Sequence, residues 1–227
     1  QEDGTWDSLE VQVRARGNWR QENCFLTPVK LQIKKEQRKG TLFEGNKELK
    51  MVLPCKISED GQDWVMKEYM AYKSFEVISP YHFKTRRLDI DFSDVKGKKE
   101  KQYQLEGFLI EDISNVAKRC NAKRMKRNVD PRQQDAFCCT QNDFFQYLIG
   151  NTDYSVSGRH NLKILGMPGF GSEGYTPVPY DFDIAGIVDA YYANPREGLG
   201  LTSVRVRYYQ GPCRSDEAFM EAIEHIN

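Results

Sequence analysis

Apolar and polar residues alternate with a two-residue period in several short stretches near the start of the chain. This pattern is typical of strands and covers residues 9–15 and 29–33, with a tight Arg-Gly-Asn connection between them. Residues 49–55 form a third candidate strand. Two further strand-like segments flank the charged sequence VKGKKEK. Residues 84–110 are therefore predicted to form a hairpin with an exposed turn.

Helical spacing of large apolar residues is clearest in residues 63–78, and Pro80 ends that pattern. Residues 113–149 are predicted to be helical, with a basic, proline-containing interruption. Gly150 is predicted to cap the end of the last helix in this segment. A terminal helix is predicted after Ser215, because acidic residues follow in its first turn.

Together these elements predict an α+β protein with two parts. Residues 1–112 are expected to form a strand-rich part with one main helix, and residues 113–227 a more helical part. A cleft is expected where the two parts meet.

The composition is that of a folded protein and narrows the function classes. The 227 residues suffice for one large domain or two small lobes. The 33 basic and 33 acidic side chains cancel, so no overall charge favours nucleic acid or an anionic membrane. No apolar run approaches the roughly 18 residues that a membrane-spanning helix needs.

The N-terminus and the cysteines bear on the processing of the chain and on its cellular compartment, and the compartment stays open. The sequence begins at Gln1 without an initiator methionine and without an apolar leader, which indicates a processed or trimmed chain. The six cysteines include no C-x-x-C pair, which argues against a zinc site or a thioredoxin-like site. Disulfides and free buried thiols both stay open.

Candidate chemistry begins in residues 147–165, YLIGNTDYSVSGRHNLKIL, where a polar centre interrupts apolar flanks. Asp153 follows the predicted helix cap, and Asn161 leads into a strand-like segment. Both carry oxygen atoms suited to a hard cation or to a hydroxyl proton. Residue types alone leave an Asx-capped turn open as the alternative.

A second acidic motif, VPYDFDIAG, places Asp181 and Asp183 directly after another strand-like segment. The two carboxylates would share one face if this segment were extended. Buried together without a cation or a donor, they would repel each other, and at least one would tend to take up a proton.

These residues form the set of groups used in phosphoryl transfer: a catalytic aspartate, a metal-binding asparagine and a later metal-binding aspartate. Protein kinases have H-R-D-x-x-x-x-N followed by D-F-G. In this chain Asp153 lies eight positions before Asn161, and D-F-D replaces D-F-G. The order of the groups agrees with the kinase pattern, but the spacing does not.

A kinase-type site also needs a cation on the nucleotide phosphates, usually a strand lysine paired with a helix glutamate. Lys50 in the candidate strand and Glu68 in the following helix have this order. Lys30 and Lys34 are competitors on an earlier strand. A solvent-facing lysine and a surface glutamate are the open alternatives.

Other motifs carry less weight. The sequence GFGSEG, residues 169–174, matches a phosphate-binding pattern, but Pro168 precedes it and no helix is predicted to follow, so it is interpreted as a loop. The basic run 118–127 lacks interleaved aromatics and is interpreted as a solvated helix face. A serine hydrolase has little support, because no G-x-S-x-G motif occurs. His160 is assigned a hydrogen-bonding role.

The ordered motifs resemble the CotH-like atypical kinases and, more distantly, HipA-type and phosphoinositide-kinase-like enzymes. The resemblance runs from about residue 9 to about residue 213, and its most specific part is the GNTD…HN and PYDFD pair. The motifs that carry it are RARGNWR, LKMVLPC, MKEYMAY, FLIED, YLIGNTDYSVSGRHN and VPYDFDIAG. The resemblance implies a two-lobed kinase-like fold that binds ATP and Mg or Mn between its lobes and phosphorylates a protein hydroxyl.

The resemblance also implies roles for individual residues. Asp153 resembles the catalytic aspartate, and Asn161 and Asp181 resemble the metal ligands, with Asp183 as an additional metal group. Lys50 resembles the phosphate-binding lysine and Glu68 its helix partner. Glu111 and Asp112 fall where the connection between the lobes would meet the adenine. The Arg16 turn takes the place of a glycine-rich loop, so arginine side chains are expected to contact the phosphates there.

The sequence therefore predicts an ATP- and metal-dependent phosphotransferase that acts on a protein substrate. An inactive kinase-fold binding or coat module, a nucleotidyl transferase and a metal-dependent hydrolase are the alternatives. An extracytoplasmic location is favoured because relatives of this kind are often found there. The acceptor, the oligomeric state and the pairing of the cysteines stay open.

Overall fold

The structure is a computed structural model that describes residues 8–17, 19–97, 99–169 and 174–226. Its N-terminal elements are β1 (Val11–Ala15), α1 (Trp19–Asn23), β2 (Val29–Ile33), α2 (Lys35–Arg38), β3 (Glu48–Val52), α3 (Glu59–Ile78), β4 (Thr85–Asp94) and β5 (Lys101–Ile110). The elements that follow are α4 (Ile113–Arg119), β6 (Lys123–Met125), a short 3₁₀ turn (Pro131–Gln133), α5 (Ala136–Leu148), β7 (Leu162–Gly166), β8 (Tyr175–Pro179) and α6 (Asp216–Glu224).

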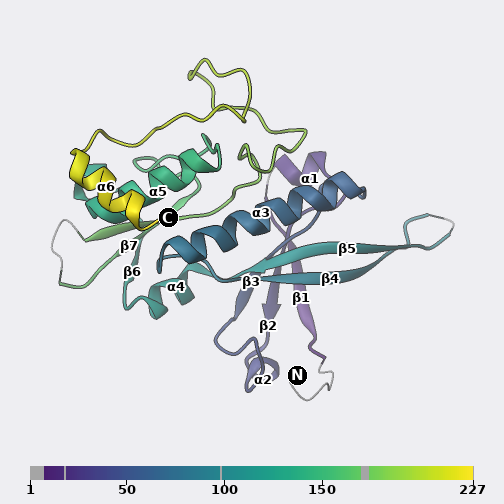
Figure 1. Cartoon of the computed structure of the whole chain (residues 1–227). Coiled ribbons are helices and arrows are strands. Elements are labelled where there is room, and N and C mark those ends of the chain that lie inside the picture. The colour runs from purple at the N-terminus through teal and green to yellow at the C-terminus, as the bar shows by residue number, and fades with distance from the viewer. Residues whose placement is uncertain (1–7, 18, 98, 170–173, 227) are drawn as a thin grey trace.

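The strands form two antiparallel sheets that are separate in sequence. The first sheet has the order β1-β2-β3-β5-β4, and the second has the order β6-β7-β8. The long helix α3 lies across the first sheet, and the second sheet and α5 lie on the other side of this helix (Figure 1). The β4–β5 hairpin extends beyond the rest of the sheet (Figure 1).

The main apolar core surrounds α3 and includes residues from both parts of the chain. Tyr72 and Phe75 of α3 are buried and face Phe108 of β5, Phe145 of α5 and Phe182 of the D-F-D motif. The ring centroids of Phe182 and Tyr72 lie 4.8 Å apart, and those of Phe182 and Phe145 lie 5.6 Å apart. This aromatic cluster fixes the polypeptide on either side of Phe182, where Asp181 and Asp183 lie.

A disulfide between Cys24 and Cys55 joins the end of α1 to the connection between β3 and α3. Cys120, Cys138, Cys139 and Cys213 are free thiols. The structure therefore contains both states that the sequence left open. The disulfide keeps α1 beside the first turn of α3 (Figure 1).

The α+β expectation is confirmed, and so are several individual elements. Strand β2 has the predicted bounds, and the β4–β5 hairpin and the terminal helix α6 form where predicted. Gly150 follows α5 with a positive φ of 67°, the left-handed conformation in which glycine commonly ends helices. Helix α3 begins at Glu59, four residues before the predicted start, because Ser58 caps it by accepting a hydrogen bond from the Gly61 amide.

One local prediction is wrong. The basic run 118–127 is not one helix face, because α4 ends at Arg119 and residues 123–125 form β6, which pairs with β7. The extended backbone under which Asp181 and Asp183 would share one face does not occur, because Asp181 has a φ of 68°. Most of the GFGSEG motif, residues 170–173, lies outside the described residues. Among the helices that the structure describes, none is long and apolar enough to cross a membrane.

Phe182→Ala is expected to lower the free energy of unfolding by about 3–5 kcal/mol, because it leaves a cavity among fully buried aromatic rings. Urea denaturation measures this loss. Val77→Ala is the control, since Val77 lies on α3 with 89% of its surface exposed and should change stability by less than about 0.5 kcal/mol. Equal stability of the two variants would contradict this description of the core.

Candidate active site

Asp153 and Asn161, eight positions apart in sequence, are in direct contact. The Asn161 side-chain amide donates to the Asp153 carboxylate at 2.9 Å and to its backbone carbonyl at 2.8 Å. His160 Nε2 lies 2.9 Å from the other oxygen of the same carboxylate, in line with the predicted hydrogen-bonding role. Asn161 has a φ of 50°, a left-handed conformation that asparagine tolerates better than most residues.

The extra residues between Asp153 and Asn161 form an outward turn. Ser155 and His160 pair as an antiparallel bridge, with backbone hydrogen bonds of 3.0 and 3.1 Å. Gly158 donates its amide to the Ser155 hydroxyl at 3.0 Å and closes the turn. We call this Ser155–His160 bridge the neck of the loop, because it holds the two ends of the loop together. The longer loop therefore leaves the Asp153 and Asn161 side chains in contact.

A buried polar network under this loop holds Asp153 in place. Asn151 accepts a hydrogen bond from the Asp153 amide at 2.9 Å and donates to Gln146 of α5 at 2.8 Å. Tyr154 donates its hydroxyl to the buried Asp143 of α5 at 3.1 Å. Two consecutive positions of the loop, Asp153 and Tyr154, are therefore tied to one helix.

Asp181 lies beside the same loop. The Tyr180 amide donates to the Asn161 carbonyl at 3.0 Å, so the D-F-D motif starts next to Asn161. The Asp181 amide donates to the Tyr72 hydroxyl of α3 at 2.9 Å. Burial raises the pKa of Asp183, and the negative charges of Asp181 and, to a smaller extent, Asp153 add to this shift.

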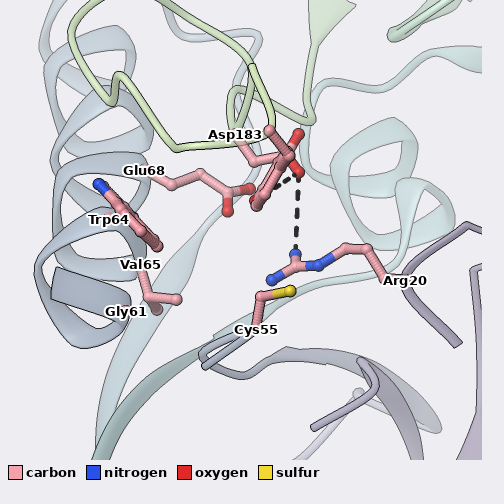
Figure 2. Close-up of a pocket in the computed structure, with 8 residues that line it drawn as sticks. Arg20, Cys55, Gly61, Trp64, Val65, Glu68 and Asp183 are labelled. Carbon is pink, nitrogen blue, oxygen red and sulfur yellow. Dashed lines mark hydrogen bonds and ion pairs between the residues drawn. The ribbon is translucent and has the colours of Figure 1, made fainter. Parts of the chain in front are cut away.

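Asp183 faces a nearly closed pocket shared with Glu68 and Arg20. Figure 2 shows the carboxylates of Glu68 and Asp183 directed toward the Arg20 guanidinium. Arg20 Nη1 lies 4.0 Å from the Asp183 carboxylate, and Arg20 Nη2 donates to the Leu53 carbonyl at 2.9 Å. Tyr192 donates its hydroxyl to Asp183 at 3.0 Å. The pocket leaves about 10 Å³ free, enough for about one water.

The charges in this pocket change one another's protonation. Burial, followed by the charge of Asp183, raises the pKa of Glu68 well above its usual range. Burial and the charge of Asp181 likewise raise the pKa of Asp183. Arg20 opposes both shifts, and its own pKa is raised because Tyr192, Asp183 and Glu68 outweigh the effect of its burial. Arg20 is the cation that keeps this pair of carboxylates tolerable in the interior.

Lys50 lies in a second, positively charged cluster. Its ammonium group is 4.7 Å from the centroid of the Tyr180 ring, and Lys163 contacts the same ring at 4.2 Å. Burial, then the charges of Arg16 and Lys163, lower the pKa of Lys50 to about 8, while Asp181 and Asp112 oppose the shift. The Nε atom of Arg16 is buried and has no hydrogen-bond partner in the described part of the chain.

The predicted pair between Lys50 and Glu68 does not form among the described ion pairs. Each of these residues lies on the predicted element, Lys50 on β3 and Glu68 on α3. Their surroundings differ, however, because Glu68 shares a pocket with Arg20, whereas Lys50 faces Tyr180. The cation near Glu68 is therefore Arg20 of α1 and not Lys50 of β3.

Glu111 and Asp112 make structural contacts at the chain crossing between the two sheets. Glu111 accepts a hydrogen bond from the Lys84 amide and is ion-paired with Arg119 at 2.7 Å. Asp112 caps α4 by accepting a hydrogen bond from the Ser114 amide at 2.9 Å. Both side chains are therefore engaged in contacts within the protein.

Sequence reasoning missed Arg20, Tyr72, Tyr192 and Lys163. Arg20 was within reach, because it lies four positions after Arg16 in the same RARGNWR motif. Lys163 was too, because it lies two positions after Asn161 on a strand where alternate residues share a face. Nothing in the sequence marks Tyr72 or Tyr192, whose hydroxyls reach the D-F-D segment only through the tertiary fold.

In the described ranges, no group of three His, Cys, Asp or Glu side chains is close enough to hold a metal ion. Comparison with known protein-family models and with curated protein sequences found no match for the chain.

Replacing Arg20 should unmask the cost of the buried carboxylates. Arg20→Met is expected to lower the free energy of unfolding by about 3 kcal/mol, because Glu68 and Asp183 lose their cation. Adding Glu68→Gln should restore at least about 1 kcal/mol of that loss, since one carboxylate is then neutral. Chemical denaturation of the single and double variants measures the coupling.

Arg14→Met on the exposed strand β1 is the matched control for that experiment and should leave stability within about 0.5 kcal/mol. Strictly additive losses in the double variant would show that Arg20 and Glu68 do not interact.

The pH dependence of stability should report on Asp143. Burial raises its pKa to about 6, against hydrogen bonds from Tyr154, Asn142 and Cys139 and the charge of Arg214. Because the folded protein then binds a proton that the unfolded chain has released, stability should fall by about 3 kcal/mol as pH rises from about 4 to about 6.

Asp143→Asn should remove this part of the pH dependence, as measured by urea denaturation across the same range. Asp91→Asn on the exposed face of β4 controls for the change in charge. An unchanged slope in Asp143→Asn would contradict the assignment.

Proposed function

We propose that the protein is an ATP- and divalent-metal-dependent phosphotransferase with a two-lobed, kinase-like fold that transfers the γ-phosphoryl group to a protein hydroxyl. The observation that carries the proposal is the pairing of two opposite charge clusters around Tyr180 and Asp181. In addition to burial, Arg16 and Lys163 lower the pKa of Lys50 in the cationic cluster, and Asp181 and Asp153 raise the pKa of Asp183 in the acidic cluster.

The cationic cluster fits a polyphosphate. Arg16 has a buried Nε without a partner, and Lys50 takes part in no ion pair among the described residues. A buried donor without an acceptor costs about 1–3 kcal/mol, so Arg16 favours binding an anion. A nucleotide phosphate would accept hydrogen bonds from both groups and raise the lowered pKa of Lys50.

The acidic cluster fits a hard divalent cation. The Asn161 amide nitrogen is used by Asp153, which leaves its side-chain oxygen as the donor atom toward a metal. Asp181 and Asp183 supply carboxylate oxygens, the ligand type that Mg or Mn prefers. Asn161 and Asp181 would hold the ion, with Asp183 beside them. When bound, the ion supplies charge neutralisation to the phosphates.

Asp153 is the group best placed to orient the acceptor hydroxyl. Its carboxylate is held by Asn161 on one oxygen and by His160 on the other, and 28% of its side chain remains exposed. A fixed, partly exposed carboxylate can accept the hydroxyl proton in line with phosphoryl transfer. Arg20 and Glu68 act behind the site by fixing Asp183.

The proposed chemistry leaves room for the alternatives as experimental outcomes. An inert binding module has no need for a carboxylate pair that is costly to bury, which supports an enzyme. The Cys24–Cys55 disulfide supports an oxidising, extracytoplasmic location. We propose that the backbone at Glu111 and Asp112 lies near the adenine. Their side chains already have partners within the protein, Arg119 and the Ser114 amide.

Asp153→Asn should lower the phosphotransfer rate by about 10²–10⁴-fold while leaving the stabilisation by ATP and Mn intact. Asp181→Asn should abolish the metal-dependent part of that stabilisation. The measurements are transfer of the γ-phosphoryl group to casein, followed by intact mass, and thermal unfolding with and without nucleotide and metal.

Asp91→Asn is the control and should match the wild type in both measurements. Absence of any nucleotide-dependent stabilisation of the wild type would exclude the proposal in favour of a binding module. Attachment of AMP would replace it with nucleotidyl transfer, and phosphate release without a modified protein would replace it with a hydrolase.

A further inference from the structure

A second surface feature, outside the charge clusters, is a groove of about 300 Å³ on the C-terminal part. Its floor is backbone from two glycines, Gly150 and Gly186, joined by a hydrogen bond from the Gly186 amide to the Gly150 carbonyl of 3.0 Å. A side chain at Gly186 would collide with the Val204 carbonyl, so three chain segments meet there at backbone distance. The backbone is therefore tightly packed at these two glycines, which line the groove.

The rim of the groove combines apolar and cationic side chains. Leu148 and Ile187 line it with 47% and 45% of their surface exposed. Arg205 and Arg207 line the other side. Exposed apolar side chains beside cations are a common feature of surfaces that bind partners.

The two arginines are held in position before any partner arrives. The Nε atom of Arg207 donates to the Leu148 carbonyl at 3.0 Å, and its terminal nitrogens have no partner among the described residues. Arg205 donates from Nε to the Asp189 carboxylate at 2.8 Å. Asp189 balances the charge of Arg205, and Arg207 has no carboxylate partner among the described residues, so the two arginines leave a net positive charge at the rim.

The groove adjoins the candidate active site through the chain itself. Gly150 lies three residues before Asp153, and Gly186 lies three residues after Asp183. Three residues span at most about 11 Å, so a bound peptide of a few residues could reach from the groove to the Asp153 carboxylate.

We propose that this groove binds an acidic peptide segment of the protein acceptor, with a branched apolar residue seated between Leu148 and Ile187. This inference rests on the proposed function, because it supplies the acceptor for the same site. The net positive rim selects carboxylates, and the groove volume suits a few side chains.

The test uses fluorescence anisotropy of a labelled peptide, Glu-Glu-Asp-Leu-Ile-Glu-Asp-Glu, with the full chain and without nucleotide. Binding should saturate, weaken as salt rises, and disappear when every acidic residue of the peptide is replaced by lysine. Arg205→Gln combined with Arg207→Gln should weaken binding about ten-fold.

Ile187→Glu should weaken binding by a similar factor and tests the groove without touching the Arg207–Leu148 contact. Arg86→Gln, on the exposed strand β4, is the matched control and should bind like the wild type. Thermal unfolding confirms that each variant is folded.

Equal binding by the wild type and all groove variants, or no binding by the wild type, would overturn the proposal. A dimer that Ile187→Glu dissociates in light scattering would also overturn it, in favour of self-association. Nucleotide-dependent stabilisation, measured in parallel, separates the two proposals. If it is absent while peptide binding behaves as expected, only the phosphotransferase proposal fails, and in the reverse case only the groove proposal fails.

Discussion

The Arg20 guanidinium, buried between Glu68 and Asp183, is the interaction on which the arrangement of the site depends. It joins three segments far apart in sequence: α1, α3 and the loop after β8. Two carboxylates in a nearly closed pocket are unfavourable without a cation, and Arg20 is held there by the Leu53 carbonyl. The Cys24–Cys55 disulfide lies at the end of the same helix and limits how far α1 can move away.

The site as a whole stores electrostatic free energy that a ligand can release. Burial shifts the pKa of Lys50 down and that of Asp183 up, and like charges nearby, Arg16 and Lys163 for Lys50 and Asp181 for Asp183, add to both shifts. A ligand that carries both a polyphosphate and a divalent cation would neutralise both clusters. Under the proposed function, the free protein would give up some stability in exchange for affinity.

Features set by local sequence were predictable, and features set by long-range contacts were not. The β4–β5 hairpin and α6 follow from a charged turn and from a Ser215 cap, which act within a few residues. Strand β6 was missed because its three residues become a strand only by pairing with β7. Helix α1 was missed because its five residues carry no periodic pattern, and its position depends on long-range links, the Cys24–Cys55 disulfide and the hydrogen bond from Arg20 to the Leu53 carbonyl.

The candidate site shows the same division. Asp153, Asn161 and Asp181 could be placed together from motif order, and hydrogen bonds do connect their segments. The partner of Glu68 could not be chosen, because a strand lysine and an arginine from α1 satisfy the same charge requirement in sequence. Only the fold distinguishes them, by placing Lys50 over Tyr180. The turn at Asp181 was hidden because aspartate is compatible with both extended and left-handed backbone.

Because Ser155 and His160 form a bridge at the neck of the loop, the positions of Asp153 and Asn161 do not depend on the length of the loop between them. Residues 156–159 lie beyond this bridge, so a change in their number would leave the contact between the two side chains in place. Related chains would then share this pair at variable spacing, and a fixed interval between aspartate and asparagine would fail to group them. The conserved quantity would be the hydrogen-bonded closure of the loop.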